Sequence, residues 1–206
     1  MKIKNSLPLD NNIYSLKLFS ELLIKKNIEH CIFFGSLLGV TRDNALIEGD
    51  DDIDFYVNLK EREKVIAILD DLSVQIDFSK KPNNSSYFIQ ADFEHRNKRL
   101  RVDFYFYESD IDDNYIYERW NFEAKPKYEQ FMLKIPKVFI YPLNKIESNY
   151  GCIYMPAHPE LICEYLYGSR WKTPLKKNQE YQVRVMGGKP YMFYINHEQK
   201  KLELLP

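Results

Sequence analysis

A run of acidic residues that continues into an apolar segment constrains the fold of this 206-residue chain more than any other feature. The run 50–52 is all aspartate and leads directly into a strand-like segment, 53–58, that contains Asp54. Residues two apart in a strand share a face, so Asp52 and Asp54 are predicted to project together while Ile53 points into the core. Adjacent carboxylates repel each other unless a cation lies between them. Because all the ligands would be oxygens, the expected cation is Mg²⁺ or Mn²⁺.

A Gly-Ser pair stands upstream of the acidic run. The apolar segment 31–34 is typical of a short buried strand, and Gly35-Ser36 ends it before a helical turn begins at Leu37. The start of a helix presents free backbone N–H groups and partial positive charge, which suit a phosphate group. Alone, the pair would fit an ordinary strand-to-helix turn with a serine cap. Since an Asp-x-Asp follows at the spacing of a helix, a loop and a strand, Gly35 and Ser36 are predicted to cradle a phosphate.

A third aspartate occurs in a later strand-like segment. Asp103 lies within 100–106, and aspartate is unfavourable in the middle of a strand. If this strand neighbours 53–58, Asp103 completes a cluster of three carboxylates; the alternative is a core ion pair with Arg101 or Arg99. We predict a metal site formed by Asp50, Asp52, Asp54 and Asp103, in which Asp52, Asp54 and Asp103 are catalytic.

Arg42 follows the Gly-Ser pair closely and has two interpretations of equal weight. Its guanidinium group could clamp a phosphate through two hydrogen bonds, or it could form a surface ion pair with Asp43 or Glu48.

The order of the expected elements indicates an α/β fold, a mixed sheet with helices against it and a small C-terminal extension. Helices are predicted at 11–27, from 37 onward, at 60–72 and at 159–167. Strands are predicted at 31–34, 53–58, 74–78, 87–91, 100–106, 138–141 and 151–154, with the 87–91 and 100–106 strands as a hairpin and a further hairpin within 191–205. Residues 111–131 lack a clear period and are predicted to form a loop over the site.

Composition excludes several classes of protein. The formal net charge of −1 leaves no basic surplus for a nucleic-acid partner, and 45% hydrophobic residues suffice for a folded core. Cys31, Cys152 and Cys163 form no CxxC pair and are predicted to be buried thiols in a reducing compartment. No apolar stretch approaches about 18 residues, so no membrane span is expected, any membrane association would be peripheral, and the expected location is the cytoplasm.

The Gly-Ser pair, the Asp-x-Asp and the later aspartate together resemble the nucleotidyltransferase-fold superfamily. Within it the chain is similar to the LicD family, which includes bacterial phosphocholine transferases and the fukutin-type ribitol-phosphate transferases. The first matching block is 35–54, including Arg42. The second block runs from Tyr141-Pro142 to Pro174 and includes Trp171, which is expected on this resemblance to contact substrate, although a core position is the default for tryptophan.

The chain departs from the family pattern at a few positions. Ser36 stands where the family usually has threonine, so a hydroxyl group is kept. Gly49 replaces a bulky residue before the acidic run, and Ala45-Leu46 replaces Gly-Phe. These changes preserve the metal site and leave the identity of the substrate open.

The resemblance implies a nucleotidyltransferase-like core at 1–110 and a LicD-type C-terminal part at 111–206 that packs on it. It implies a transferase of substituted phosphate groups that moves phosphocholine, ribitol phosphate or a similar group from a CDP-activated donor to a sugar hydroxyl of a cell-surface glycan. The partners are then a CDP-alcohol and a glycan acceptor such as lipopolysaccharide, capsule or teichoic acid. Two alternatives stay open: transfer of a nucleoside monophosphate from an NTP to a small hydroxylated substrate, and a non-catalytic binding module on the same fold.

Overall fold

The structure is a computed structural model that describes residues 8–74, 87–109, 113–120, 131–174, 193–196 and 201–204. Its helices are α1 (Leu9–Lys25), α2 (Phe34–Asp43), α3 (Arg62–Asp71), α4 (Lys137–Ile140) and α5 (Pro159–Tyr167), and a 3₁₀ turn at Leu59–Glu61 precedes α3. Its strands are β1 (His30–Ile32), β2 (Ile53–Asn58), β3 (Phe88–His95), β4 (Lys98–Ser109), β5 (Tyr115–Trp120), β6 (Phe131–Pro136), β7 (Asn144–Ser148), β8 (Gly151–Met155), β9 (Phe193–Asn196) and β10 (Lys201–Leu204).

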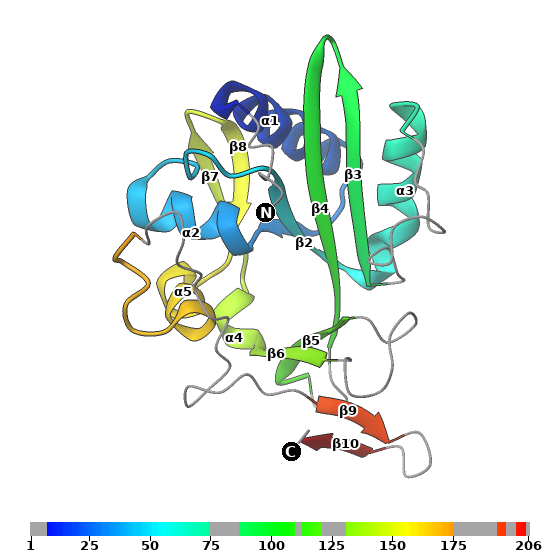
Figure 1. The fold of residues 1–206 in the computed structure, drawn as a ribbon. Helices are drawn as coiled ribbons and strands as arrows, with labels where there is room; N and C mark the ends of the chain where they lie inside the picture. Colours follow the sequence, from blue (N-terminus) through cyan, green and yellow to red (C-terminus); the bar gives the residue numbers. More distant parts are fainter. Residues whose placement is uncertain are drawn as a thin grey trace, which may run out of the picture.

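A mixed sheet of β1 to β6 organises these elements (Figure 1). Its strand order is β1-β2-β4-β5-β6, and β3 also pairs with β4. The β2–β4 pair is parallel and the other pairs are antiparallel. Because β4 has 12 residues, its first part pairs with β3 and its last two residues pair with β5. β7–β8 and β9–β10 form two separate hairpins. The fold is therefore the mixed α/β sheet with flanking helices that the sequence predicts.

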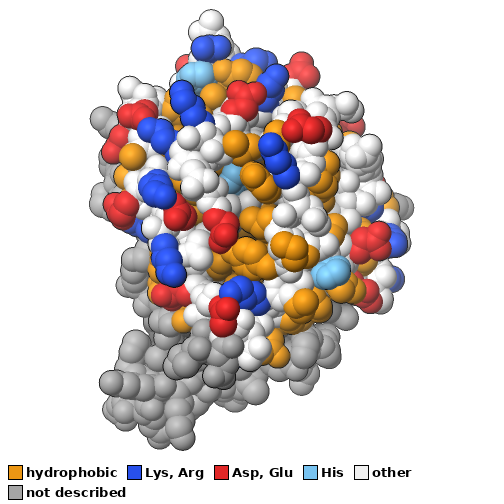
Figure 2. All heavy atoms as spheres, turned by 180° about the vertical axis from the view of Figure 1, so that it is seen from behind, with side chains coloured by type: hydrophobic (Ala, Val, Ile, Leu, Met, Phe, Trp, Pro, Cys, Tyr) orange, Lys and Arg blue, Asp and Glu red, His pale blue; other side chains and the backbone are white. Residues whose placement is uncertain are grey.

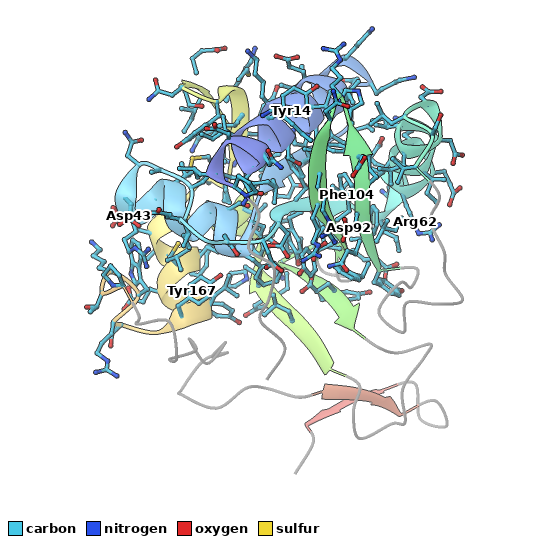
Figure 3. The ribbon with its side chains drawn as sticks, turned by 45° about the horizontal axis from the view of Figure 1, so that its top comes forward. Tyr14, Asp43, Arg62, Asp92, Phe104 and Tyr167 are labelled. Carbon is cyan, nitrogen blue, oxygen red and sulfur yellow. The ribbon has the colours of Figure 1, made fainter. Side chains whose placement is uncertain are left out.

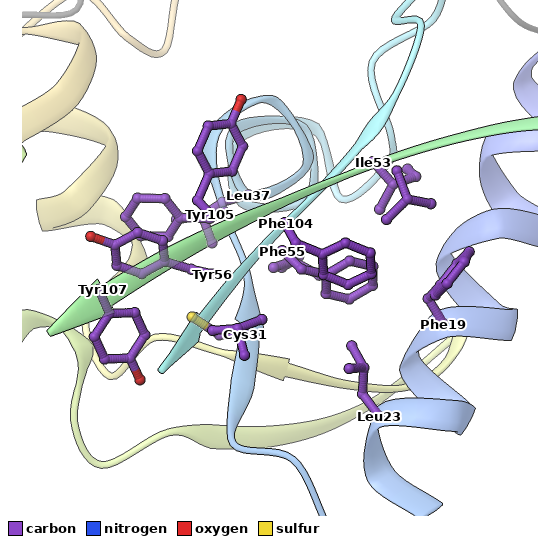
Figure 4. Packing of buried hydrophobic residues seen from close by; sticks show 14 of the residues in the cluster. Phe19, Leu23, Cys31, Leu37, Ile53, Phe55, Tyr56, Phe104, Tyr105 and Tyr107 are labelled. Atoms are coloured by element: carbon purple, nitrogen blue, oxygen red, sulfur yellow. The ribbon is translucent and has the colours of Figure 1, made fainter. Parts of the chain in front are cut away.

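The apolar core lies on both faces of this sheet, and α1 packs against one of them (Figure 4). Phe19 and Leu23 of α1 are completely buried, and Phe19 meets Phe104 of β4 edge-on at 5.6 Å between ring centroids. Phe104 in turn stacks on Phe55 of β2 at 5.7 Å. Since side chains alternate along a strand, the residues on either side of Phe55 and Phe104 project from the opposite face. That opposite face carries Asp54 and the other aspartates of interest.

α2 packs closely against the segment that follows it in the chain. Its C-terminus is closed by Asn44 in the left-handed conformation, with a φ of 52°. A side chain at Gly39 would place its Cβ only 2.6 Å from the carbonyl oxygen of Ala45 and 3.0 Å from the backbone nitrogen of Ile47. Glycine at 39 therefore permits a close approach that fixes where α2 lies and where its N-terminus points.

Most of the predicted elements are confirmed. The structure contains the predicted helices as α1, α2, α3 and α5, although α1 begins two residues earlier than expected. The strand predicted at 31–34 is β1, which ends at Ile32, and α2 begins at Phe34, so that Gly35 and Ser36 lie in its first turn and not before it. It also contains the strand at 53–58, the hairpin of β3 and β4, the strand at β8 and the final hairpin of β9 and β10. The predicted strand at 74–78 lies, apart from Val74, outside the described residues.

Two segments were predicted with the wrong secondary structure. Residues 138–141, predicted as a strand, belong mainly to the short helix α4; the N–H of Lys137 bonds the carbonyl of Asn114, and the N–H of Tyr141 bonds that of Lys137. The predicted loop at 111–131 contains β5, in which Ile116 and Glu118 are buried between half-buried tyrosines. That period-two alternation was present in the sequence and was obscured by the many aromatic residues around it.

Three further observations concern the helices, the surface and the cysteines. Among the described residues, no helix is both long and apolar enough to cross a membrane. Figure 2 shows one face of the molecule, where hydrophobic side chains gather in the middle and charges of both signs surround them. Cys31 and Cys163 are buried as predicted, whereas Cys152 is half-buried.

Candidate active site

Three of the predicted carboxylates come together at one end of the β2–β4 pair. The parallel register places Asp54 directly beside Asp103, and Asp52 lies two residues before Asp54 on the same side. Carboxylate oxygens of the three residues lie within 4.8 Å of one another. Asp54 and Asp103 are 5% and 4% exposed, so these are buried acids. The predicted gathering of three carboxylates from two strands is thus what the structure contains.

The N-terminus of α2 is attached to this cluster by a reciprocal pair of hydrogen bonds. The backbone N–H of Asp54 donates to Ser36 Oγ at 2.9 Å, and the backbone N–H of Ser36 donates to Asp54 Oδ2 at 3.4 Å. A Cβ atom at Gly35 would lie 2.7 Å from Asp50 Oδ2 and 3.3 Å from Asp54 Oδ2. Ser36 therefore fixes the position of Asp54, and Gly35 makes room for two carboxylates. Their contact with a phosphate stays a prediction.

The acidic run before β2 is held from two sides. Asn12 of α1 donates from Nδ2 to the backbone carbonyl of Asp50 at 2.9 Å. Asp51 forms an ion pair with Arg101 of β4. Oxygens of Asp50, Asp51 and Asp52 also lie within 4.8 Å of one another. The acidic run is consequently a fixed feature of the site.

Burial and crowding of these carboxylates disfavour their charged forms. Burial, followed by the repulsion of Asp103 and the other nearby carboxylates, raises the pKa of Asp52 to about 8. Burial, followed by the repulsion of Asp52, holds the pKa of Asp54 well above its usual range. A cation among them would relieve this repulsion. Carboxylate oxygens are the ligands that Mg²⁺ and Mn²⁺ prefer, so the donor set fits these ions.

Arg99 and Arg101, the arginines of the alternative interpretation of Asp103, bind other carboxylates. Gln90 of β3 donates from Nε2 to Asp103 Oδ2 at 3.2 Å. Both arginines donate to Asp92 of β3, which Figure 3 labels, and Gln90 is a donor to Asp103. Because both arginines are directed to Asp92, Asp103 keeps its carboxylate within the cluster.

Two predicted substrate-binding residues lie elsewhere. Arg42 is in the last turn of α2, and its Nε and Nη2 atoms donate to Asp43 Oδ2 at 2.9 and 2.6 Å. The structure thus contains the ion-pair alternative for Arg42, at the end of α2 away from Ser36. Trp171 is 4% exposed and packs in the core, with the ammonium of Lys172 5.1 Å from its ring. Substrate contacts of both side chains stay predictions.

Three residues of the site were not predicted from the sequence: Asn12, Gln90 and, as a partner of the acidic run, Arg101. Asn12 sits in an amphipathic helix, where one polar residue carries no signal. Gln90 stands in the apolar segment 87–91, which marks it only weakly. For Arg101 a signal existed, because Arg101 and Asp92 have opposite charges and lie directly across the β3–β4 hairpin.

A separate pocket of about 630 Å³ lies away from the carboxylates. It is lined by residues from the end of α1, from β1 and from the 141–154 region, among them Glu29, His30, Tyr141 and Tyr154. His30 pairs with Val57 near the end of β2, whereas Asp54 is near the start of that strand. This pocket is therefore at the other end of β2 and contains none of the predicted site residues.

The chain is similar in sequence to one family of known proteins. A family described as LicD/FKTN/FKRP, nucleotidyltransferase domain, matches residues 27–158, well over half of the chain. Among solved structures, the chain is similar to the lincomycin-bound crystal structure of the lincosamide antibiotic adenylyltransferase LnuA, with a TM-score of 0.48 and 15% sequence identity over 74% of this chain and 82% of that one. No curated protein matches the chain. From the match over 27–158, the chain belongs to the LicD family of transferases and carries its nucleotidyltransferase domain.

Proposed function

We propose that this protein transfers a phospho-alcohol group from a CDP-activated donor to a sugar hydroxyl of a cell-surface glycan, using Mg²⁺ or Mn²⁺. The observation that carries the proposal is the cluster of half-buried Asp52 with buried Asp54 and Asp103, whose oxygens lie within 4.8 Å of one another beside the N-terminus of α2. Membership of the LicD family supports the transferase class. The CDP donor and the glycan acceptor are the parts of the proposal that need an experiment.

The residues of the cluster divide into metal-holding and supporting roles. Asp52, Asp54 and Asp103 would hold the metal, and Asp50 would be an auxiliary ligand. A bound Mg²⁺ would neutralise negative charge on the donor diphosphate. Ser36 keeps Asp54 in place through the reciprocal hydrogen bonds, so Asp54 needs little rearrangement when a cation binds. The backbone N–H of Ser36 is directed to Asp54 of this cluster, and the start of a helix suits a phosphate oxygen.

The proposed reaction is an in-line displacement at phosphorus. The oxygen of the acceptor hydroxyl forms a bond to the phosphorus that carries the alcohol, and the bond from that phosphorus to the oxygen of CMP breaks. Asp103 takes the proton of the acceptor hydroxyl, and CMP leaves with the electron pair of the broken bond. Gln90 holds Asp103 in orientation through its hydrogen bond to Oδ2. The reaction thus needs one carboxylate that can face the acceptor and others that face the donor.

A ligand screen tests the donor. Purified protein is melted with Mg²⁺ and, separately, CDP-choline, CDP-ribitol, CDP-glycerol, CTP or ATP. A ligand at about 100 times its dissociation constant stabilises the protein by about 2.7 kcal/mol, which is readily measured. Asp52→Asn is run beside the wild type, and Asp43→Asn serves as a control because Asp43 is a surface aspartate paired with Arg42, away from the cluster.

The outcomes separate the proposal from its alternatives. We expect a Mg²⁺-dependent shift with one CDP-alcohol, lost in Asp52→Asn and kept in Asp43→Asn, followed by release of CMP when a glycan acceptor is added. A shift with an NTP alone and release of pyrophosphate would replace the proposal with nucleoside monophosphate transfer. No shift with any nucleotide would favour a non-catalytic module.

A further inference from the structure

Arg101 connects the acidic run to the middle of the sheet. Its Nη1 donates to Asp51, while Nε and Nη2 donate to Asp92 Oδ2 at 3.3 and 2.9 Å. Asp51 immediately precedes Asp52, whose carboxylate belongs to the three-residue cluster. One planar guanidinium therefore links β3, β4 and the loop before β2 at the edge of the candidate active site.

The surroundings of Arg101 distinguish this bridge from ordinary surface ion pairs. The side chains of Arg101, Asp51 and Asp92 are only 18%, 14% and 20% exposed. The neighbouring Arg99 binds the same Asp92 with 45% of its own side chain exposed. Exposed pairs contribute little to stability, whereas a half-buried bridge with fixed geometry can orient a loop.

We propose that Arg101 is a positioning residue for metal binding, which holds Asp51 and thereby keeps Asp52 facing Asp54 and Asp103 before the cation arrives. The inference rests on the proposed metal-dependent function and deepens it. Its physical basis is preorganisation: three carboxylates that repel one another would move apart unless their backbone were restrained. Arg101 restrains the backbone next to Asp52 from one side, as Asn12 does through the carbonyl of Asp50 from the other.

The proposal predicts whether the metal affinity rises or falls when Arg101 is replaced. Arg101 carries positive charge close to the cluster, so a purely electrostatic role would oppose Mg²⁺, and Arg101→Gln would then tighten metal binding. A positioning role has the opposite consequence, because loss of the bridge releases Asp51 and Asp52. Arg101→Gln should therefore weaken binding of Mg²⁺ and Mn²⁺ by about tenfold.

The experiment is a calorimetric titration of the nucleotide-free protein with MnCl₂ and MgCl₂. Arg101→Gln is compared with Arg99→Gln, which removes a guanidinium from the same Asp92 and should leave the metal affinity unchanged within about twofold. Arg101→Lys keeps the charge but cannot bridge two carboxylates in the same fork. We expect it to bind metal more weakly than wild type also, and it provides the test if Arg101→Gln does not fold.

A second comparison asks whether Arg101 acts through Asp51. In an Asp51→Asn background the bridge is already broken, so adding Arg101→Gln should cause no further loss of metal affinity. Unchanged or tighter binding in both Arg101 variants would overturn the proposal. If the wild type itself binds neither ion, the metal-dependent function fails, and that result is distinguishable because it does not depend on any Arg101 variant.

Discussion

Asp54 combines two properties that rarely occur together in one residue, burial within a strand and a side chain that carries charge in water. Its pKa is held well above the usual range, chiefly by burial. Burial thus disfavours the charged form of Asp54, and Asp54→Asn puts a neutral group of the same shape in its place. We expect the melting temperature of the metal-free protein to be unchanged or higher, while Mg²⁺ binding is lost.

Turnover should respond much more strongly to the same substitution. Charge stabilisation by a catalytic metal contributes several kcal/mol, so the rate should fall by about a thousandfold in Asp54→Asn. Melting curves with and without Mg²⁺, together with initial rates, measure both effects, and Asp43→Asn is the control. An Asp54→Asn protein with wild-type activity would contradict the assignment of the site.

The raised pKa of Asp52 gives a pH dependence of stability. Its ordinary value is 3.8 and its value in the fold is about 8, so between these limits the native state holds more protons than the unfolded state. The free energy of unfolding must therefore decrease as pH rises through this window. In Asp52→Asn this contribution is absent, so the free energy of unfolding should decrease less between about pH 5 and pH 8 than it does in the wild type.

Urea unfolding at several pH values in EDTA measures this difference. His30 acts in the opposite direction, because burial lowers its pKa to about 4 and stability is lost as pH falls from 6.5 toward 4. Comparing the variant with wild type at each pH removes the contribution of His30. Parallel profiles for the two proteins would show that Asp52 is not destabilised by its neighbours.

The site residues that sequence could reveal are those whose type conflicts with their surroundings. Asp54 and Asp103 stand out because aspartate is unfavourable within an apolar strand. Asn12 and Gln90 do not, since a polar residue in an amphipathic helix or strand is ordinary until the tertiary fold brings it to a partner. The sequence did not reveal the partner of Arg42, because the spacing of the residues fits an ion pair with Asp43 and a contact with a ligand equally well.

At the scale of elements, α2 contains two glycines with different roles. A Cβ at Gly35 would meet the carboxylates of Asp50 and Asp54, whereas one at Gly39 would meet the backbone around Ala45. Alanine is favoured over glycine in a helix by about 1 kcal/mol, and overpacking costs about 1–3 kcal/mol. Gly35→Ala should thus leave the free energy of unfolding within about 1 kcal/mol of wild type, because the Asp50 side chain can move.

We expect one of the two substitutions to affect metal binding and the other to affect stability. Gly35→Ala should weaken Mn²⁺ binding by about tenfold, because it displaces carboxylates of the cluster. Gly39→Ala should reduce the free energy of unfolding by about 1–3 kcal/mol with little change in Mn²⁺ affinity, because backbone atoms cannot yield as a side chain can. Urea unfolding and Mn²⁺ titration of both variants check the pattern; equal effects of the two alanines on both quantities would refute it.

Helices and strands could be predicted where the hydrophobic pattern extended over many residues, or where proline or glycine marked their ends. α5 has proline at its start and Gly168 after its end, and its bounds were predicted correctly. The segment 138–141 was too short for its period to distinguish helix from strand. Its helical turn is instead set by contacts with other parts of the chain, since the carbonyls of Phe139 and Ile140 accept the N–H groups of His158 and Ala157.

At the scale of the whole molecule, the apolar core covers both faces of the central sheet and forms without contributions from the carboxylates. One face carries the aromatic core that packs on α1, through Phe55 and Phe104. The opposite face carries Tyr56, Tyr105 and Tyr107 of the same core beside the carboxylates, whose mutual repulsion opposes folding. Because the core does not include the carboxylates, the fold should form without metal, unlike small domains whose folding requires a structural ion.

Divalent metal should therefore add stability to a protein that is already folded. In EDTA we expect the far-ultraviolet circular dichroism of a folded α/β protein and a cooperative urea transition. Mg²⁺ at about 100 times its dissociation constant should raise the free energy of unfolding by about 2.7 kcal/mol and the melting temperature by about 5–10 °C. The urea midpoint should rise with an unchanged m-value, since the surface exposed on unfolding stays the same. NaCl at equal ionic strength should not reproduce the shift, because general screening lacks the coordination that relieves Asp52, Asp54 and Asp103. A protein without a cooperative transition in EDTA would show that the metal builds the fold, and that the apolar core does not suffice without it.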